Sequence, residues 1–270
     1  MEQPFFSIIT VCYNAGNGLL RAIEELQAQT CSDIQYIIKD GGSTDGSFSE
    51  ASALLREDSR AVLLSCADIG IYDAMNQALS YANGKYVYFL NCGDRFADSE
   101  VLADVKQYLE ANTANDTVIY GDFLLRGEKI LQPQKINRFY LYRRPLNHQS
   151  AFFSREIFER QGGFDISFKV RADHEIMLRA YMGGSNFLKL DRVICFYEGG
   201  GFSEREEQRA ACANELIALR KRYFTDSERA RYDRRIRFSF EKTRRFMRSK
   251  RAPRWLRSLY RRFANFYNSK

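Results

Sequence analysis

The sequence predicts an α/β fold, in which a mostly parallel sheet is flanked by helices and followed by a basic helical extension. In the first third of the chain, apolar β-branched runs alternate with segments whose apolar residues recur at helical spacing. Polar residues follow four successive strand-like runs at the point where each run ends. Charge is divided between an acidic body and a basic, aromatic end. Together these observations indicate the fold class and separate the extension from the main domain.

Strands and helices alternate through the first half of the chain. The run at 6–12 is apolar and β-branched, which favours a strand, and the run at 19–28 has helical spacing. The same alternation predicts further strands at 34–39, 61–66 and 86–90, and helices at 47–56 and 73–82. Strands that alternate with helices of this length indicate a parallel sheet covered on both faces.

The second half is less regular. The pattern predicts strands at 117–125, 150–153, 187–190 and 192–197, with a break between the last two, and helices at 155–160 and 173–181. A glycine-rich loop at 198–203 precedes a further helix that we expect to begin near Glu204.

The end of the chain differs from its body in charge. The 270 residues carry a net charge of +7, but residues 220–270 hold 19 Lys and Arg against 4 Asp and Glu. This segment therefore carries +15, and residues 1–219 carry −8. We expect a main domain at 1–218 and a basic amphipathic helical extension at 219–270.

The cysteines and the N-terminus indicate a cytoplasmic protein. The six cysteines include no Cys-x-x-Cys pair, which disfavours a zinc site, and buried reduced thiols fit a reducing compartment. The first residues lack the basic and apolar segments of a signal peptide. The longest apolar run is too short to span a bilayer.

Polar residues gather at the predicted strand ends. Right-handed crossovers place the carboxyl ends of parallel strands along one edge, where open α/β sheets bind ligands. The residues expected at this edge are Tyr13, Asn14, Asp40, Asp68 and Asp94. Asp45 and Asp73 have a simpler explanation, as a turn former and a helix cap.

These residue types suit a nucleotide site built on carboxylates. The chain has neither Gly-x-Gly-x-x-Gly after its first strand nor Gly-x-x-x-x-Gly-Lys-Ser/Thr, so the dinucleotide and P-loop interpretations lose their main support. Asp40 could accept the imide N–H of uracil, and Tyr13 could lie against the base. Asp94, with the carbonyl of Asn91 nearby, offers oxygen ligands for Mg²⁺ or Mn²⁺, which a diphosphate beside carboxylates would need. The alternative for 91–94 is an ordinary loop after a buried strand.

Several motifs in this order and spacing resemble family 2 glycosyltransferases. They are FSIITVCYN (6–14), KDGGSTDG (39–46), DIGIYDAMN (68–76) and FLNCGD (89–94), and more weakly HQ (148–149), GGFD (162–165) and ADHEIMLR (172–179). The chain looks most like the bacterial members that build surface polysaccharides. The resemblance implies the Rossmann-like GT-A fold and a metal-dependent, inverting transfer of a sugar from a nucleotide-sugar, UDP-linked in our expectation. The acceptor would be a hydroxyl of a saccharide or a lipid-linked molecule in polysaccharide, lipopolysaccharide or capsule assembly.

The resemblance also assigns roles to individual residues. Asp40 corresponds to the family's base-binding aspartate, and the Asp-x-Asp metal motif falls on 91–94. Asn91 and Gly93 stand where that motif often has acidic residues, so Asp94 remains the main metal ligand. Asp68 is a further candidate contact to the nucleotide-sugar. The family's catalytic base maps onto Asp173, whose other explanation is a helix N-cap.

Two further residues are candidates for contact with the acceptor or a phosphate. His148 precedes a predicted strand and could point into the cleft, or it could be a hydrogen-bonded structural histidine. Ser203 lies in the glycine-rich loop, which could fold over the donor as a lid or serve as a plain hinge.

The basic end has the pattern of an interfacial helix. Apolar residues follow spacing of three and four, with arginines largely between them, at Trp255, Leu256, Leu259, Tyr260, Phe263 and Phe266. Such a helix lies in an anionic membrane surface, which would place the protein at the inner face of the cytoplasmic membrane. Alternatively, the apolar stripe packs on the body or on a second subunit. Binding of nucleic acid, and a catalytically inactive nucleotide-binding scaffold, are the rival functions; the acidic body disfavours the former.

Overall fold

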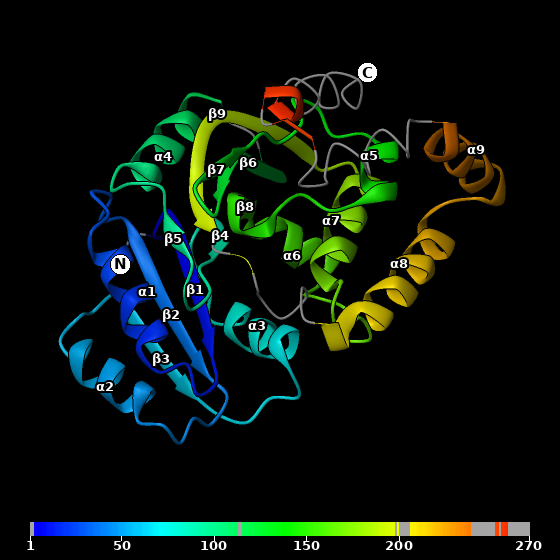
Figure 1. Cartoon of the computed structure of the whole chain (residues 1–270). Coiled ribbons are helices and arrows are strands. Elements are labelled where there is room, and N and C mark those ends of the chain that lie inside the picture. The colour runs from blue at the N-terminus through cyan, green and yellow to red at the C-terminus, as the bar shows by residue number, and fades with distance from the viewer. Residues whose placement is uncertain are drawn as a thin grey trace.

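A twisted sheet runs through the middle of the protein, with helices on both faces (Figure 1). The computed structural model describes residues 3–112, 115–197, 199, 206–238, 252–253 and 255–258. Over these residues the strand order is β3-β2-β1-β4-β8-β6-β9-β5, and β7 pairs with β6. The predicted alternation of strands and helices is confirmed in the first half.

The first half contributes four parallel strands and three helices. They are β1 (Phe6–Cys12), α1 (Asn17–Gln27), β2 (Ile34–Asp40), α2 (Ser47–Leu54), β3 (Ala61–Ser65), α3 (Ile71–Leu79) and β4 (Tyr86–Phe89). β1 lies between β2 and β4 and pairs with Asp40 of β2 through its last residue, Cys12. This register brings the residues that follow β1 beside the end of β2.

The second half adds antiparallel pairings to the parallel strands. Its elements are β5 (Arg95–Phe96), α4 (Val101–Ala111), β6 (Thr117–Leu125), β7 (Glu128–Ile130), α5 (Arg138–Arg143), η1 (His148–Ser150), β8 (Ala151–Ser154), α6 (Arg155–Gln161), α7 (Ala172–Met182) and β9 (Asn186–Tyr197). β8 is antiparallel to both β4 and β6, while β9 is parallel to β6.

The predicted break between two strands after residue 190 is wrong, because β9 is continuous. The irregularity is in the pairing instead: the register of β6 against β9 shifts between Tyr120 and Phe123. Gly121 lies at this bulge, and a Cβ there would come 2.5 Å from the carbonyl oxygen of Arg192. The close approach of the two backbones explains why glycine occupies the position.

Two apolar clusters, one on each face, stabilise the sheet. One contains residues of α1, α2 and α4, such as Leu19 and Val105, and the other contains residues of α3, α6 and α7, such as Met75 and Ile176. Both clusters are built from side chains that are almost fully buried. Three layers result, with the sheet in the middle, as the fold class requires.

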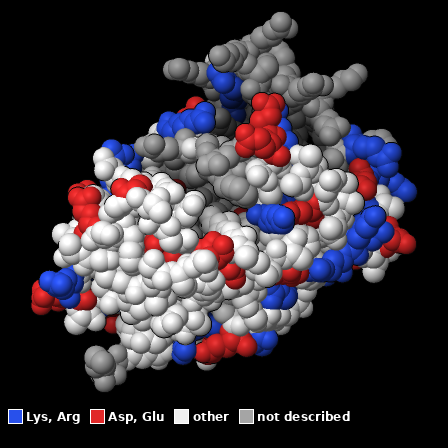
Figure 2. Space-filling model, turned by 90° about the horizontal axis from the view of Figure 1, so that it is seen from below, with Lys and Arg blue, Asp and Glu red and all other residues white. Residues whose placement is uncertain are grey.

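Two C-terminal helices pack on the body beside α5 and α7 (Figure 1). After η3 (Glu206–Gln208) they are α8 (Arg209–Tyr223) and α9 (Asp226–Phe238). Leu219, Phe224 and Tyr232 are buried in the same cluster as α7. Figure 2 shows Lys and Arg gathered on the side that these helices form. The predicted boundary at 218/219 falls within α8, so this first part of the basic extension is joined to the main domain.

The remainder of the predicted interfacial helix lies outside the described residues, apart from 255–258. Leu259, Tyr260, Phe263 and Phe266 belong to that part, as does Ser203 in the glycine-rich loop. Trp255 is described and is 68% exposed. None of the helices over the described residues is both long enough and apolar enough to cross a membrane.

His174, on α7, makes the stability of the fold depend on pH. Its side chain is fully buried, and Nε2 lies 2.6 Å from the carbonyl oxygen of Leu141. Burial lowers the pKa of His174 to about 4. As the pH falls, His174 therefore binds a proton near pH 6.5 in the unfolded chain but only near pH 4 in the folded protein.

We predict that this difference removes about 3 kcal/mol from the free energy of unfolding as the pH falls from 6.5 to 4. His174→Gln keeps a donor within reach of Leu141 but does not titrate, so its stability should fall less over this range. Urea unfolding of both proteins at several pH values measures the difference. Parallel curves for the two proteins would show that the buried histidine is not responsible.

Candidate active site

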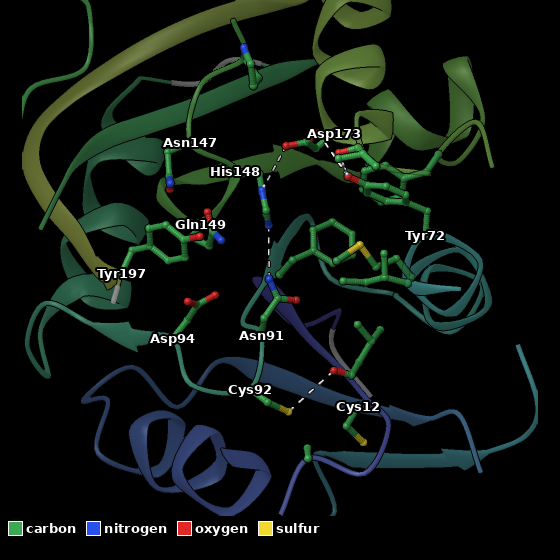
Figure 3. A pocket seen from close by; sticks show the side chains of 18 of the residues that line it. Cys12, Tyr72, Asn91, Cys92, Asp94, Asn147, His148, Gln149, Asp173 and Tyr197 are labelled. Carbon is green, nitrogen blue, oxygen red and sulfur yellow. Dashed lines mark hydrogen bonds and ion pairs between the residues drawn. The ribbon is translucent and has the colours of Figure 1, made fainter. Parts of the chain in front are cut away.

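A cleft of about 590 Å³ opens where the ends of β1 and β4 meet η1 and the start of α7 (Figure 3). Its lining combines residues of both halves of the chain. The polar and aromatic ones include Tyr13, Tyr72, Asn91, Asp94, Asn147, His148, Gln149, Asp173 and Tyr197. Five predicted site residues, Tyr13, Asn91, Asp94, His148 and Asp173, therefore lie in one cleft.

Tyr13 marks the mouth of the cleft on the donor side predicted from the sequence. It directly follows β1 and is 68% exposed, as an aromatic platform for a planar ligand would be. A Cβ on Gly41 would come 3.4 Å from the Tyr13 ring and 2.8 Å from Oδ2 of Asp68. Three predicted donor residues, Tyr13, Asp40 and Asp68, thus surround one turn.

The Asp40 carboxylate is occupied by its own loop. It accepts hydrogen bonds from the backbone N–H groups of Gly42 and Ser43 and from the hydroxyls of Ser43 and Ser65. Burial would raise the pKa of Asp40, but these hydrogen bonds lower it overall. Asp40 is 1% exposed and does not line the cleft, so its contact with a base stays a prediction.

Asn14 shapes the same loop. Its backbone is left-handed, with φ of 49°, and its Oδ1 accepts a hydrogen bond from the N–H of Thr44 at 2.9 Å. Its own N–H donates to Oγ of Ser43 at 2.7 Å. Asn14 therefore ties the segment after β1 to the segment after β2, and its contact with a nucleotide-sugar also stays a prediction.

Lys39 is a buried residue that the sequence reading misses. Its side chain is fully buried, and Nζ lies 2.9 Å from Oδ2 of Asp68 and 2.7 Å from the carbonyl oxygen of Cys66. Nζ also donates to the carbonyl oxygen of Asp40. Asp68 is therefore attached to β2, and its contact with a nucleotide-sugar stays a prediction. A lysine in an otherwise apolar strand directly before Asp40 was the available signal.

Three buried oxygen atoms in the cleft have no hydrogen-bond partner among the described residues. They belong to Asn91, Asp94 and Asn147, through Oδ1, Oδ2 and Oδ1 respectively. Burial raises the pKa of Asp94 to about 6, although the charge of His148 and hydrogen bonds from Asn91 oppose this effect. Buried oxygen atoms without a hydrogen bond lower the stability of the folded protein, and a cation or a hydrogen-bond donor bound in the cleft would remove that cost.

These oxygens partly fit a divalent cation. Carboxylate and amide oxygens are the ligands that Mg²⁺ and Mn²⁺ prefer, and Asp94 and Asn91 supply them at the end of β4. No cluster of three or more His, Cys, Asp or Glu able to hold a metal occurs in the described part of the chain. The protein would therefore hold a cation with few ligands of its own, leaving the rest to the substrate.

Across the cleft, His148 pairs with Asp173. Nδ1 of His148 lies 3.3 Å from Oδ2 of Asp173, and Nε2 lies 3.3 Å from Nδ2 of Asn91 (Figure 3). Burial would lower the pKa of His148, but Asp173 and Asp94 outweigh it and raise this pKa. Burial has the opposite effect on Asp173 and would raise its pKa, but the hydrogen bond and charge of His148 lower this pKa overall. The pairing favours an ionised Asp173 that faces Nδ1 of His148, and the contact with Asn91 is a hydrogen bond when Nε2 of His148 accepts from Nδ2.

Asp173 is held from several directions. Its Oδ1 accepts from the hydroxyl of Tyr72, on α3, at 3.3 Å and from the N–H of His174 at 2.8 Å. The N-cap of α7 is Arg171, so Asp173 occupies the second position of the helix. The cap explanation for Asp173 therefore fails, and Tyr72 joins the site as a residue that the sequence reading misses.

Most residues that line this cleft lie in the part of the chain that matches a known protein family. The family model of Glycosyl transferase family 2 matches residues 7–166, which ends before Asp173. A PGL/p-HBAD biosynthesis glycosyltransferase of Mycobacterium bovis is 28% identical over 208 residues, 75% of this chain and 80% of that protein. An uncharacterized glycosyltransferase of Mycobacterium tuberculosis is 31% identical over 217 residues, 77% of this chain and 80% of that protein.

Solved structures agree with the architecture. S. aureus TarS 1–349 in complex with UDP-GlcNAc has a TM-score of 0.66 at 18% identity, covering 90% of this chain and 75% of that one. In another TarS structure the match spans only 45% of that chain. Mannosyltransferase PcManGT from Pyrobaculum calidifontis in complex with GDP-Man and Mn²⁺ has a TM-score of 0.63 at 18% identity, covering 82% of this chain and 64% of that one. The predicted GT-A fold is confirmed.

We predict that Asp94→Asn stabilises the metal-free protein. At pH 8 the buried carboxylate is ionised although burial penalises its charge, and the neutral amide avoids that penalty. The free energy of unfolding, measured with a chelator present, should rise by about 2 kcal/mol at pH 8. The gain should shrink as the pH falls from 6 to 4, where the carboxyl group is neutral as well.

Asp191→Asn is the matched control, because it removes one charge from an exposed position on β9. Its free energy of unfolding should change little. If Asp94→Asn instead destabilises the metal-free protein, the Asp94 carboxylate contributes to the fold, and its assignment to a ligand site would be wrong.

Proposed function

The chain belongs to glycosyltransferase family 2, and from this premise we propose that it transfers a sugar from a UDP-sugar to a hydroxyl with inversion. The acceptor in this proposal is a saccharide or lipid-linked molecule in bacterial polysaccharide, lipopolysaccharide or capsule assembly. One observation carries the proposal. Asp94, which follows β4 and has one oxygen without a partner among the described residues, and an ionised aspartate at the start of α7 line the same cleft.

The donor lies, in this proposal, between Tyr13 and Asp94. Tyr13 stacks on the base, and Asp94 and Asn91 would hold a Mn²⁺ or Mg²⁺ ion, which would supply positive charge for a leaving nucleoside diphosphate. The complexes of TarS with UDP-GlcNAc and of PcManGT with GDP-Man and Mn²⁺ support this placement at the level of the fold. Asp40 and Asn14 keep the loop that surrounds the base in shape.

Asp173 is the catalytic base in this proposal. The acceptor oxygen forms a bond to C1 of the sugar as the bond from C1 to the phosphate oxygen breaks. The hydroxyl proton passes to the Asp173 carboxylate, and the nucleoside diphosphate leaves. A low pKa keeps Asp173 ionised and ready to accept the proton, while His148 and Tyr72 hold its two oxygens in place.

We predict that UDP raises the melting temperature of the protein in the presence of Mn²⁺, because a ligand that binds only the folded state stabilises it. The melting shift with GDP, compared with that with UDP, tests whether the site prefers uracil to guanine. Asp94→Asn should lose the part of the shift that depends on Mn²⁺, while the exposed control Asp191→Asn should keep it. If no nucleoside diphosphate stabilises the protein with metal, the proposed donor site is wrong.

Adding UDP-sugars to this panel identifies a donor for kinetic work. Hydrolysis of that UDP-sugar should slow by about 10²–10⁴-fold in Asp173→Asn, since a general base contributes on this order. The melting shift with UDP should remain, because Asp173 lies on the other side of the cleft. Hydrolysis at the wild-type rate in this variant would show that Asp173 is not the base.

We further propose that the basic extension binds the inner face of the cytoplasmic membrane, where a lipid-linked acceptor would be found. Basic residues gather on α8 and α9, and the residues after them continue the pattern (Figure 2). Each basic residue near an anionic surface contributes on the order of 1 kcal/mol. The exposed Trp255 is the type of side chain that enters an interface.

Binding to vesicles tests this partner. We expect the protein to sediment with vesicles that contain phosphatidylglycerol but not with pure phosphatidylcholine, and less in high salt. Replacing Arg257, Arg261 and Arg262 together by Gln should weaken binding by about 100-fold.

The matched control replaces the exposed Arg21, Arg56 and Lys135 by Gln. It removes the same charge from the body and should bind vesicles nearly as well as the wild type. Binding to DNA or RNA at physiological salt, with none to anionic vesicles, would contradict the membrane proposal and favour a nucleic-acid partner.

A further inference from the structure

Glu215, on α8, binds the backbone segment that leads into α7. Its Oε1 accepts a hydrogen bond from the N–H of Lys169 at 2.8 Å. Its Oε2 accepts from the N–H groups of Val170 and Arg171, at 3.0 and 2.8 Å. Three successive N–H groups thus converge on one carboxylate, and hydrogen bonds to a charged acceptor are stronger than neutral ones.

Two other contacts hold the same segment. Nε of Arg171 donates to the carbonyl oxygen of Cys212, one turn earlier on α8, at 2.7 Å. From the opposite side, the hydroxyl of Tyr72 shares its single proton between the carbonyl oxygen of Val170, at 3.0 Å, and Oδ1 of Asp173, at 3.3 Å. The segment 169–171 is therefore fixed between α8 and α3.

The position of this segment determines where α7 begins. Arg171 is the N-cap of α7, and Asp173 lies two residues further on, in the first turn. The carboxylate of Asp173 must reach its partner atom within hydrogen-bonding distance, and an error of about 1 Å can cost about 100-fold in rate. Glu215 itself does not line the cleft, and α8 lies beyond the residues that the family model matches.

We propose that Glu215 is a positioning residue that sets the place of the Asp173 carboxylate by fixing the residues before α7. This inference rests on the proposed role of Asp173 as the base. It makes α8 part of the catalytic unit, although α8 contributes no atom to the cleft lining. The competing explanation is that Glu215 only attaches α8 to the body.

Glu228 provides a matched control for that explanation. It lies on α9 and attaches the C-terminal helices to the body through an ion pair with Arg138 at 2.8 Å. Among the residues that the structure describes, no hydrogen bond or ion pair joins Glu228 to the segment 169–171. Glu228→Ala should therefore lower the melting temperature without moving Asp173.

The first readout is spectroscopic and needs no substrate. The chain has only two histidines, so His148 and His174 can be assigned in ¹⁵N-histidine spectra from single substitutions. His148 contacts Asp173 directly and should report its position. At one fixed pH, we expect the His148 ring signals of Glu215→Ala to move towards those of Asp173→Asn. They should stay in place in Glu228→Ala.

The second readout is hydrolysis of the UDP-sugar that stabilises the wild type. In Glu215→Ala, kcat should fall by about 10–100-fold while KM for the donor stays within about twofold. Glu215→Gln is the rescue variant, because its carbonyl oxygen can still accept the N–H groups of Val170 and Arg171. Its kcat should stay within about threefold of the wild type. Glu228→Ala should keep the wild-type kcat below its melting temperature.

The outcomes separate this inference from the proposed function. Unmoved His148 signals in a folded Glu215→Ala, or equal kcat values for Glu215→Ala and Glu228→Ala, would overturn the positioning role. If Glu215→Ala does not fold, Glu215→Gln takes its place. The positioning role would then be overturned if folded Glu215→Gln loses as much kcat as Asp173→Asn while its His148 signals stay in place. Moved signals in a protein that hydrolyses no nucleotide-sugar would support the positioning contact and contradict the proposed function.

Discussion

The pairing of β4 with β8 is the contact on which the active-site cleft depends. β4 continues the parallel sheet of the first half through β1, and its antiparallel pairing with β8 attaches the second half. Because β8 follows η1 directly, this pairing brings His148 opposite Asn91, at the end of β4. The buried hydroxyl of Tyr88 donates to the carbonyl oxygen of Gln149 at 2.6 Å and secures the same junction. Two segments almost sixty residues apart therefore share one cleft.

In the described part of the chain, buried carboxylates differ in how fully their oxygens are paired. Lys189 on β9 and Asp122 on β6 form a buried ion pair, and the buried Lys39 on β2 pairs with the partly buried Asp68 after β3. Asp94 lines the cleft, and one of its buried oxygens has no partner among the residues that the structure describes. Proteins keep few such groups, because they cost stability, and those that remain are often found at functional sites. This contrast distinguishes the carboxylate available to a ligand from those that the fold already uses.

The sequence predicts the first half well because its signals are local. Period-two and period-3.6 patterns identify β1 to β4 and α1 to α3, and the rule for parallel sheets brings Tyr13 and Asp94 to one edge. Glu215 is different, since a glutamate on a helix surface carries no signal until the segment that it binds is known. Lys39 stands in an otherwise apolar strand, but only the fold shows that Asp68 and two carbonyl groups surround its Nζ. The continuity of β9 depends on a bulge in β6 and on Gly121, which no pattern within β9 reveals.

The position of α8 has a practical consequence for dividing the chain. Charge composition suggests a cut near residue 218, but that cut would leave Glu215 on the last turn of a severed helix and remove Leu219 from the core. Helix ends fray, so the carboxylate would lose the rigid support from which it reaches 169–171. A catalytic fragment for crystallisation or fusion should instead extend through Phe238, where α9 ends. The hydrogen bonds of Glu215 and the burial of Leu219 are thus better guides to a cut than the change in charge.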